Sequence, residues 1–217
     1  MNAAFEALLD LVYPPKCPFC CALSDGKAAV CAHCLINLPY TPVGVLPRPG
    51  RYVDEFYSAL YYKDRVRESI LRYKFGGVRG YADFYAPFLH RCADENELYA
   101  DVVTWVPLSV RRLRRRGYDQ ARLLAEAVGD YMGLDCARLV KKHRHNPPQS
   151  GKSGIEKRRE NVRGVYSLSG GVSVAGKRIL IIDDVVTTGS TLEECAKVLK
   201  RAGAKKILAL TLACTMD

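Results

Sequence analysis

Two features of membrane and secreted proteins are missing from this sequence. No stretch of the 217 residues approaches the run of about 20 apolar residues that crosses a bilayer. The N-terminal residues 1–12 are apolar, but they carry Glu6 and Asp10 and have neither the basic start nor the small-residue cleavage site of a secretory signal. We therefore expect a short amphipathic N-terminal helix and a cytoplasmic protein with no membrane span.

A complete P-loop is also missing. The only Gly-Lys-Ser sequence, from Gly151 to Ser153, lacks the first glycine of the G-x-x-x-x-G-K-[ST] pattern. Apolar residues followed by Asp183-Asp184 match the acidic strand of nucleotide triphosphatases, but that class requires the P-loop as well. A phosphoryl-accepting aspartate would normally follow the first strand of its fold, whereas this pair comes late in the chain. Both of these classes are therefore disfavoured.

Acidic residues are in the minority. The chain has 33 Lys and Arg residues against 23 Asp and Glu, which gives a net charge of +10. Such an excess favours polyanionic partners, either nucleic acid or phosphorylated small molecules; a solvated basic face is the alternative. The basic residues concentrate in a stretch from Lys141 to Arg163 and in a run after a predicted strand end, made of Arg111, Arg112, Arg114, Arg115 and Arg116.

Cysteine is abundant, and five of the nine cysteines fall between residues 17 and 34. In a chain without an export signal, such a cluster indicates metal binding rather than a disulfide framework. Two C-x₂-C pairs can each hold one metal ion from a tight turn, and together they complete a tetrahedral site. A four-ligand site is closed, so its role would be structural or a docking surface. We predict a zinc site with the ligands Cys17, Cys20, Cys31 and Cys34.

A proline-rich linker divides the chain. Between Leu38 and Gly50 lie four prolines and two glycines, a composition typical of linkers. We predict an N-terminal helix and zinc-binding module at residues 1–46 and a larger domain at residues 47–217.

Strands and helices are expected to alternate after the linker. This pattern predicts an α/β fold with a mostly parallel sheet and helices on both faces. The polar segment from His143 to Arg163 is long enough to be a functional loop. Strands are expected at residues 56–62, 101–106, 137–141, 165–168, 178–182 and 206–213, and helices around residues 66–73, 82–92, 121–132 and 191–202.

The most informative segment follows the apolar run at residues 179–182. Two carboxylates come at the end of the expected strand, and a hydroxyl-rich turn then opens into a helix. The free N–H groups and dipole of a helix start favour a phosphate, and Gly189 lets the backbone come close to it. Carboxylates beside a phosphate suit the vicinal hydroxyls of a sugar. We predict a site for 5-phosphorylated ribose at Asp183, Asp184, Val185, Val186, Thr187, Thr188, Gly189, Ser190 and Thr191.

This loop resembles the motif with which type I phosphoribosyltransferases bind phosphoribosyl pyrophosphate (PRPP): a strand, two acidic residues and T-[TA]-G-x-T. Nearly the whole chain resembles the ComF family, competence-associated proteins that join this fold to an N-terminal zinc module. Tyr118-Asp119 departs from the Phe-Asn that the family more often has. The matching segments are Val106–Ser109, Arg116–Gln120, Pro148-Gln149, Arg158–Val162 and Asp183–Thr191.

The resemblance implies a PRPP site that works with magnesium. The two aspartates would contact ribose hydroxyls, and residues 187–191 would hold the 5-phosphate. The turn after Val106 would bind pyrophosphate, and the 143–163 loop would close over the substrate and exclude water. No general base can be named. The pyrophosphate turn and flexible loop would include Pro107, Leu108, Ser109, Arg116, Gln149, Lys152 and Arg158.

Three functions remain open. The first is a PRPP-binding protein that acts in DNA uptake and natural transformation on the cytoplasmic side, with single-stranded DNA and other DNA-uptake proteins as partners. The second is an active phosphoribosyltransferase that transfers phosphoribose from PRPP to a nucleobase-like acceptor. The third is an accessory protein that grips single-stranded DNA, and it is compatible with the first. The arginines expected to contact DNA are Arg111, Arg112, Arg114 and Arg115.

Overall fold

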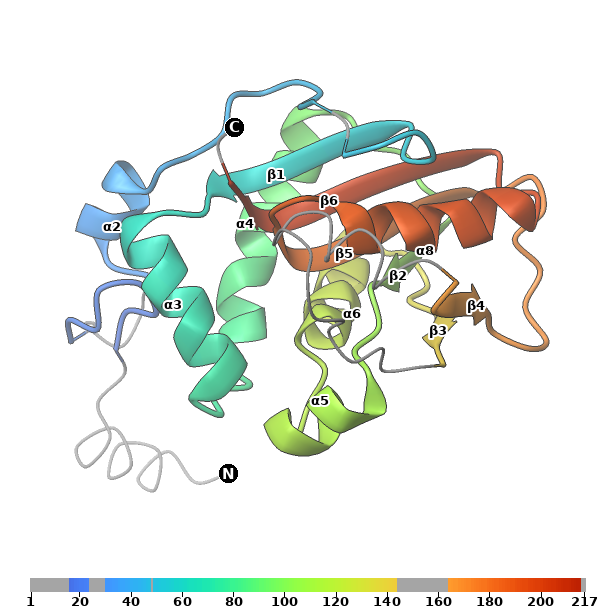
Figure 1. Ribbon diagram of the computed structural model, residues 1–217. Coiled ribbons are helices and arrows are strands. Elements are labelled where there is room, and N and C mark those ends of the chain that lie inside the picture. The colour runs from blue at the N-terminus through green and yellow to red at the C-terminus, as the bar shows by residue number, and fades with distance from the viewer. Residues whose placement is uncertain (1–15, 24–29, 48, 144–163, 216–217) are drawn as a thin grey trace, which may run out of the picture.

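The computed structural model describes residues 16–23, 30–47, 49–143 and 164–215. Its centre is a parallel four-stranded sheet in the order β1-β6-β5-β2 (Figure 1). The two central strands are largely apolar and buried, as expected for strands with both faces covered. The strands are β1 (Glu55–Tyr61), β2 (Val102–Trp105), β5 (Arg178–Val186) and β6 (Lys206–Cys214).

Helices cover both faces of the sheet, as the sequence predicted. The helices α4 and α6 pack on one face with α3 beside them, and α8 packs on the other face with the antiparallel pair β3–β4 (Figure 1). Each layer has its own buried apolar cluster. Within the described ranges, no helix is long and apolar enough to span a membrane. These elements are α3 (Asp64–Phe75), α4 (Tyr81–Glu95), α6 (Gln120–Met132), α8 (Ser190–Arg201), β3 (Val140–Lys142) and β4 (Tyr166–Leu168).

The strand before the acidic pair is longer than the sequence predicted. β5 does not end at Ile182 but continues to Val186, so both aspartates lie inside it. The reason is its neighbour: β6 offers backbone partners along this whole stretch, with Asp183 opposite Thr211 and Val186 opposite Cys214. Aspartate is disfavoured in strands by propensity, but tertiary pairing overrides propensity here.

The arginine run forms a helix that the sequence analysis did not predict. This helix, α5 (Val110–Arg116), begins after Ser109, whose hydroxyl accepts a hydrogen bond from the Arg112 N–H, and it ends at Gly117 in the left-handed conformation. A serine N-cap and a glycine after the last turn are ordinary helix boundary signals. They flank a segment that lacks a wide apolar stripe, which is why periodicity alone did not find it.

The strand expected at residues 137–141 is also displaced. β3 begins at Val140 and pairs only with β4, outside the main sheet. The preceding residues contact the edge of the main sheet instead, where Ala137 N–H donates to the Val103 carbonyl at 2.9 Å. The chain then turns away, and the β3–β4 pair comes to lie against α8.

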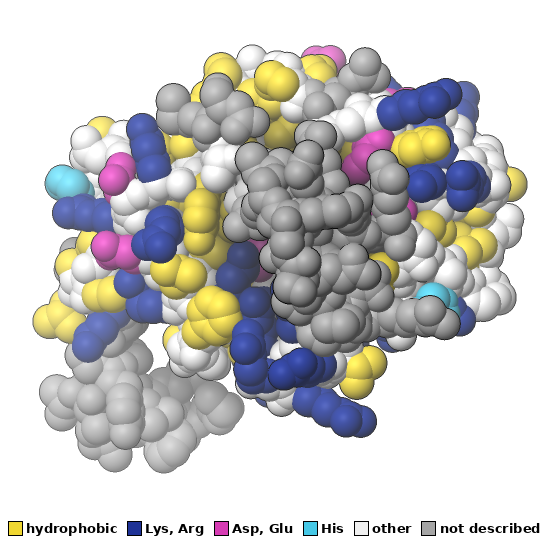
Figure 2. All heavy atoms as spheres, viewed as in Figure 1, with side chains coloured by type: hydrophobic (Ala, Val, Ile, Leu, Met, Phe, Trp, Pro, Cys, Tyr) yellow, Lys and Arg dark blue, Asp and Glu magenta, His cyan; other side chains and the backbone are white. Residues whose placement is uncertain are grey.

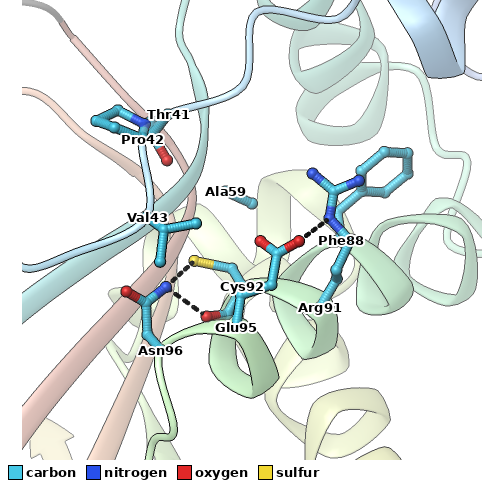
Figure 3. A pocket seen from close by; sticks show the side chains of 9 residues that line it. All are labelled: Thr41, Pro42, Val43, Ala59, Phe88, Arg91, Cys92, Glu95 and Asn96. Atoms are coloured by element: carbon cyan, nitrogen blue, oxygen red, sulfur yellow. Dashed lines mark hydrogen bonds and ion pairs between the residues drawn. The ribbon is translucent and has the colours of Figure 1, made fainter.

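The linker lies against the domain instead of bridging open space. Leu46 forms an isolated antiparallel bridge with Phe56 of β1. A small pocket of about 10 Å³ lies between the linker and α4 (Figure 3). Beside it, the Gly44 N–H donates a 2.6 Å hydrogen bond to Asn96 Oδ1. The volume of the pocket is about the space of one water molecule. These contacts hold parts of the linker against β1 and α4, while Val43 and Val45 stay exposed. The boundary between residues 46 and 47 stays a prediction.

Candidate functional site

The two aspartates of β5 lie in different environments. Asp184 is 7% exposed, and its Oδ1 lies 2.8 Å from Lys74 Nζ of α3. Its backbone N–H donates a 2.8 Å hydrogen bond to Asp183 Oδ1. Burial, together with the negative charge of Asp184, raises the pKa of Asp183 well above its ordinary value, although Lys74 acts in the opposite direction. The pair therefore holds a carboxylate neutralised by lysine beside a carboxyl group that is hard to ionise without a partner.

A cavity of about 180 Å³ opens next to these aspartates. It lies where β2 and β5 end, the edge at which open α/β sheets bind ligands. Six other helices and strands contribute to it, together with the turn after β2, and acidic and basic side chains meet there. The lining residues are Lys74, Val106, Pro107, Leu108, Arg112, Arg116, Gln120, Ala121, Lys142, Tyr166, Asp183, Asp184, Val185 and Thr191.

The basic side chains of the cavity crowd one another. Lys142 Nζ lies 2.8 Å from the Tyr166 hydroxyl, and burial together with the charge of Arg112 lowers the pKa of Lys142. Arg116 donates from Nη1 to Gln120 Oε1 at 2.8 Å, and desolvation lowers the pKa of the Arg116 guanidinium. A bound anion would relieve both effects, because it adds opposite charge to partly buried cations. The cavity is therefore suited to an anionic ligand.

Asp119 holds the turn after β2 in place. The Leu108 N–H donates to Asp119 Oδ2 at 3.2 Å, and burial raises the pKa of the Asp119 carboxyl group. Its neighbour Tyr118 is buried and donates a hydrogen bond to the Tyr73 carbonyl of α3. The Tyr118-Asp119 pair, which departs from the ComF pattern, thus fixes the predicted pyrophosphate turn and α3 to the start of α6.

The turn before α8 is shaped by the linker. Gly189 has a φ of +65°, and a Cβ atom at this position would overlap the ring of Pro49. The Glu193 carboxylate in the first turn of α8 accepts hydrogen bonds from the backbone N–H groups of Arg51, Tyr52 and Val53. Glycine is required here by both the left-handed backbone and the packing of the linker. The linker therefore forms one wall of the predicted phosphate turn.

The structure brings only part of the predicted set together. The predicted residues that line the cavity are Pro107, Leu108, Arg116, Asp183, Asp184, Val185 and Thr191. Those in the same turns but outside the lining are Ser109, Val186, Thr187, Thr188, Gly189 and Ser190. The predictions for Gln149, Lys152 and Arg158 lie outside the described residues. Arg112, predicted to contact DNA, lines the cavity, whereas the exposed side chains on α5 include Arg111, Arg114 and Arg115.

Four polar lining residues were not predicted from the sequence. Gln120 is the last residue of the Arg116–Gln120 segment that resembles the ComF pattern, but the resemblance implies no role for it. Lys74, Lys142 and Tyr166 carried no local signal, because they reach the cavity only through the packing of α3 and of the β3–β4 pair.

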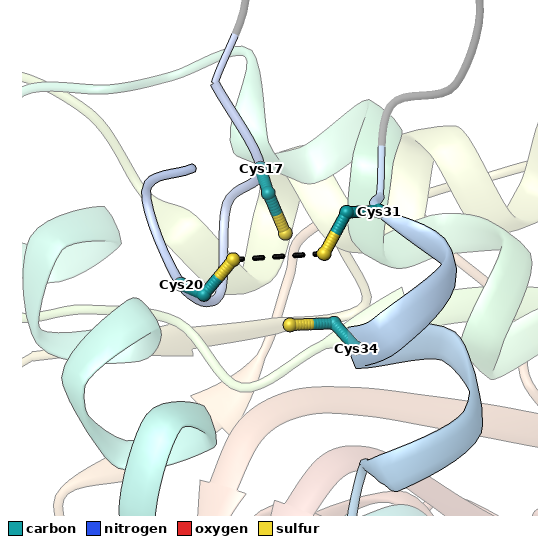
Figure 4. A group of neighbouring side chains, drawn as sticks. All are labelled: Cys17, Cys20, Cys31 and Cys34. Carbon is teal, nitrogen blue, oxygen red and sulfur yellow. Dashed lines mark hydrogen bonds between the residues drawn. The ribbon is translucent and has the colours of Figure 1, made fainter. Parts of the chain in front are cut away.

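The four predicted cysteine ligands do converge. Their Sγ atoms all lie within 4.8 Å of one another and point toward a common centre (Figure 4). Cys21 is exposed, has a φ of +60° and does not belong to the cluster. Burial and the neighbouring sulfurs of the cluster raise the pKa of Cys34, so four thiolates would repel one another without a cation between them. Four sulfur ligands at this separation fit a closed tetrahedral metal site.

Helix α3 holds the cysteine loops. Ser69 Oγ donates to the Pro18 carbonyl at 2.5 Å, and Arg72 Nη2 donates to the Pro18 and Phe19 carbonyls at 2.9 Å each. The Phe19 ring packs on Tyr85 of α4 with centroids 5.8 Å apart. Residues 32–37 form the short helix α2 (Ala32–Asn37), which carries the fourth ligand. The cluster is thus built into the same apolar core as α3 and α4.

Comparison with known proteins gives the fold family. The model of the phosphoribosyl transferase domain family matches residues 114–216. Among solved structures, the glutamine PRPP amidotransferase from B. subtilis complexed with ADP and GMP matches with a TM-score of 0.44 and 25% identity, over 62% of this chain and 26% of that chain. The arrangement of sheet and helices, preceded by the cysteine cluster, is the type I phosphoribosyltransferase fold that the sequence predicted.

Curated relatives carry names that refer to competence or to DNA utilization. Competence protein F of Haemophilus influenzae is 36% identical over 104 residues, which cover 47% of this chain and 45% of that protein. Competence protein ComFC of Streptococcus pneumoniae is 32% identical over 151 residues, covering 70% of this chain and 64% of that protein. The DNA utilization protein YhgH of Escherichia coli K12 is 34% identical over 108 residues, covering 49% and 46%. The matched segments thus span about half to two thirds of these relatives.

Proposed function

We propose that this chain, which belongs to the ComF family, binds PRPP with magnesium in the cavity at the ends of β2 and β5. The observation that carries the proposal is the charge arrangement of that cavity. It places the carboxyl groups of Asp183 and Asp184 beside several basic side chains. A polyanion without a diol has no hydroxyl groups to donate to the carboxylates. A neutral sugar has no negative charge to pair with the basic side chains. PRPP carries both features.

The proposed orientation follows the chemistry of each end. The ribose hydroxyls donate to Asp183 and Asp184, and the 5-phosphate lies at the start of α8, where backbone N–H groups and the helix dipole favour an anion. The pyrophosphate lies toward Pro107–Ser109 and Arg116. Bound magnesium would neutralise part of the pyrophosphate charge, and the carboxylate oxygens present are ligands of the type it prefers. Gln149, Lys152 and Arg158 remain candidates for a loop that closes over the ligand.

The cysteine cluster is proposed to hold a structural zinc ion. Its ligand set has four sulfurs and no open position for a substrate, which is typical of structural sites. Since α3 binds the cysteine loops and also carries Lys74, the metal would maintain the helix that reaches the PRPP cavity. The zinc-binding module at residues 1–46 and the phosphoribosyltransferase domain at residues 47–217 would then act as one unit.

A role in DNA uptake and natural transformation is proposed from the relatives and the charge. The relatives are named competence and DNA utilization proteins, and exposed arginines follow one another on α5. Arginines clustered on one element favour a nucleic-acid backbone. We place the protein in the cytoplasm, where reduced cysteines bind zinc, with single-stranded DNA and other DNA-uptake proteins as partners.

A thermal-shift series with ligand fragments tests the PRPP proposal. The protein is heated with magnesium and either PRPP, ribose 5-phosphate, pyrophosphate or ATP. We expect PRPP to raise the melting temperature most, because a ligand that binds only the folded state stabilises it in proportion to the logarithm of its concentration over Kd. Ribose 5-phosphate and pyrophosphate should each give a smaller rise. A rise with ATP equal to that with PRPP would contradict the proposal, since the site would then not distinguish PRPP from another phosphorylated ribose.

Turnover separates binding from catalysis. The second candidate function, transfer of phosphoribose to a nucleobase-like acceptor, is favoured by the match to the phosphoribosyl transferase domain family. Pyrophosphate release is measured with PRPP, magnesium and a set of purine, pyrimidine and nicotinate-type acceptors. Release that depends on one acceptor would establish the enzyme. Stabilisation by PRPP without release from any acceptor would support a protein that binds PRPP and is controlled by it.

A further inference from the structure

One large aromatic side chain lies exposed beside the phosphoribose cavity. Phe75 is the last residue of α3, and its side chain is 60% exposed. Nearby Tyr73 and Tyr118 are buried, so these two tyrosines serve the core and offer no surface for a ligand. Phe75 directly follows Lys74, which lines the cavity and pairs with Asp184. The ring therefore stands at the rim of the proposed PRPP site.

Two arginines of α5 lie over this ring. The guanidinium carbon of Arg116 lies 4.9 Å from the Phe75 ring centroid, and that of Arg115 lies 6.0 Å away. Such cation–π contacts orient an aromatic ring without burying it. Arg116 also lines the cavity. The Phe75 ring is thus contacted by two guanidinium groups, while 60% of the side chain remains exposed and available to a planar group.

The surroundings of Phe75 are strongly basic. α5 has the sequence Val-Arg-Arg-Leu-Arg-Arg-Arg and contains no acidic residue. Figure 2 shows Lys and Arg side chains gathered over α5 at the lower edge of this face. Scattered exposed apolar residues are normal and need no ligand. An aromatic ring held by guanidinium groups at the edge of an arginine cluster is different, because it combines the two features that bind single-stranded nucleic acids: stacking surface and phosphate-binding charge.

We propose that Phe75, held by Arg115 and Arg116, is a stacking platform for a base of single-stranded DNA whose phosphates contact the arginines of α5. This inference rests on the proposed role in DNA handling and gives that role a site. The same chemistry would accept a free nucleobase as an acceptor in phosphoribosyl transfer. The strand is favoured over the free base because the charge continues outward from the ring along α5, on Arg111 and Arg114, where a single base would not reach.

The binding test compares an oligonucleotide with and without its bases. Fluorescence anisotropy measures the affinity of the full chain for oligo(dT) and for an abasic strand of the same length. We expect wild type to bind oligo(dT) about tenfold more tightly, the effect of one stacked base. The Phe75→Leu variant, which keeps apolar bulk but removes the ring, should bind both strands equally and leave the abasic affinity unchanged. Tyr99→Leu is the matched control, since Tyr99 is 72% exposed and precedes the opposite end of β2.

A tryptophan reporter gives an independent readout. The chain has one tryptophan, Trp105, which is 7% exposed, so a Phe75→Trp variant adds an exposed fluorophore at the platform. We expect oligo(dT) to quench the added fluorescence and the abasic strand to leave it unchanged. Quenching by free thymine or adenine only when PRPP is bound, with none by oligo(dT), would overturn the choice of a strand in favour of an acceptor base.

The remaining outcomes separate this inference from the role on which it rests. If wild type binds oligo(dT) and Phe75→Leu binds it equally well, the platform is refuted while DNA binding stands. If wild type binds neither strand at low salt, both the DNA role and the platform are refuted. A loss of affinity in Tyr99→Leu equal to that in Phe75→Leu would also contradict the platform, because the effect would not be local to Phe75.

Discussion

The cysteine cluster and the phosphoribose cavity differ in how much of the chain each one needs. All four cysteines come from residues 17–34 and present their sulfurs from one tight turn and from the start of α2. The cavity takes side chains from residues 74–191, contributed by strands, helices and turns on both sides of the sheet. The first draws all of its sulfur atoms from one short segment, whereas the second draws its side chains from most of the domain. Sequence spacing is therefore a strong guide to the cluster and a partial guide to the cavity.

Helix α3 joins these two regions. Its middle turns hold the cysteine loops through Ser69 and Arg72, and its last turn places Lys74 beside Asp184. The Arg65 guanidinium also lies 3.3 Å from His33 Nδ1, next to the fourth cysteine. The two regions are thus connected directly through α3. The following predictions test how far the stability and the ligand binding of one region depend on the other.

The largest effect is expected from loss of the metal. Cys34→Ser removes a buried ligand, and we expect it to destabilise the protein by at least about 3 kcal/mol, since zinc-finger peptides bind zinc with about 10–16 kcal/mol. Calorimetry should show a melting temperature lower by roughly 10 °C, and the bound zinc should be lost. Cys21→Ser is the matched control, because Cys21 is exposed and outside the cluster. Equal stability of Cys34→Ser and Cys21→Ser would show that the four-cysteine cluster does not stabilise the fold through a bound metal.

A smaller effect is expected at the cavity end of α3. Lys74→Met leaves the Asp184 carboxylate buried without its cation, and we expect a loss of about 1–3 kcal/mol in the free energy of unfolding, the effect of leaving a buried polar group without its partner. Adding Asp184→Asn to Lys74→Met should recover part of that loss, while zinc content stays unchanged. Urea unfolding measures both, with Lys74→Arg as the control that keeps the charge. No recovery in the double variant would show that Lys74 acts through packing rather than through charge.

The pH dependence of PRPP binding should follow Asp183. Its pKa is raised in the folded protein by burial and by Asp184, so its contribution to stability is fully present below about pH 4, the ordinary carboxyl pKa, and is lost as pH rises through the folded pKa. PRPP needs the ionised carboxylate of Asp183, so its affinity should increase as the pH rises from about 4 through the folded pKa of Asp183.

The Asp183→Asn variant tests this assignment. It should melt at a higher temperature than wild type at neutral pH without ligand, and its weak PRPP affinity should vary with pH only through the 5-phosphate of PRPP, which titrates near about pH 6. Melting curves and titrations from pH 5 to 8 measure both. Stability curves that run parallel for wild type and variant would show that Asp183 is not the titrating group.

The smallest effect is expected on the salt dependence of DNA binding. Replacing Arg111 and Arg114 by Ala should reduce the slope of log affinity against log salt by roughly 1.4, since each contact to a single-strand phosphate contributes about 0.7. Arg201→Ala, at the end of α8, is the control. An unchanged slope in the α5 variant, with normal DNA affinity, would remove these arginines from the DNA site and leave the cavity proposal intact.

The features that the sequence could predict are local in the chain, and those that it could not predict depend on tertiary packing. The C-x₂-C pairs and the Asp183–Thr191 segment were readable because each is contiguous. Lys74, Lys142 and Tyr166 were not, because tertiary packing alone brings them to the cavity. The end of β5 was placed too early because aspartates usually mark a strand end, whereas pairing with β6 carries them inside. Phe75, the proposed stacking platform, could not be singled out from the sequence, because exposure, and not residue type, distinguishes it from the buried tyrosines.

The most direct test of the central proposal is a calorimetric titration of PRPP with magnesium into wild type and into the Asp183→Asn/Asp184→Asn double variant. Circular dichroism and zinc content confirm that the variant is folded before it is titrated. We predict saturable binding of one PRPP per chain in wild type and at least a hundredfold weaker binding in the variant, the loss expected when about 3 kcal/mol of hydrogen bonds to the ribose is removed. Equal affinity in the two folded proteins would contradict a phosphoribose site at the end of β5.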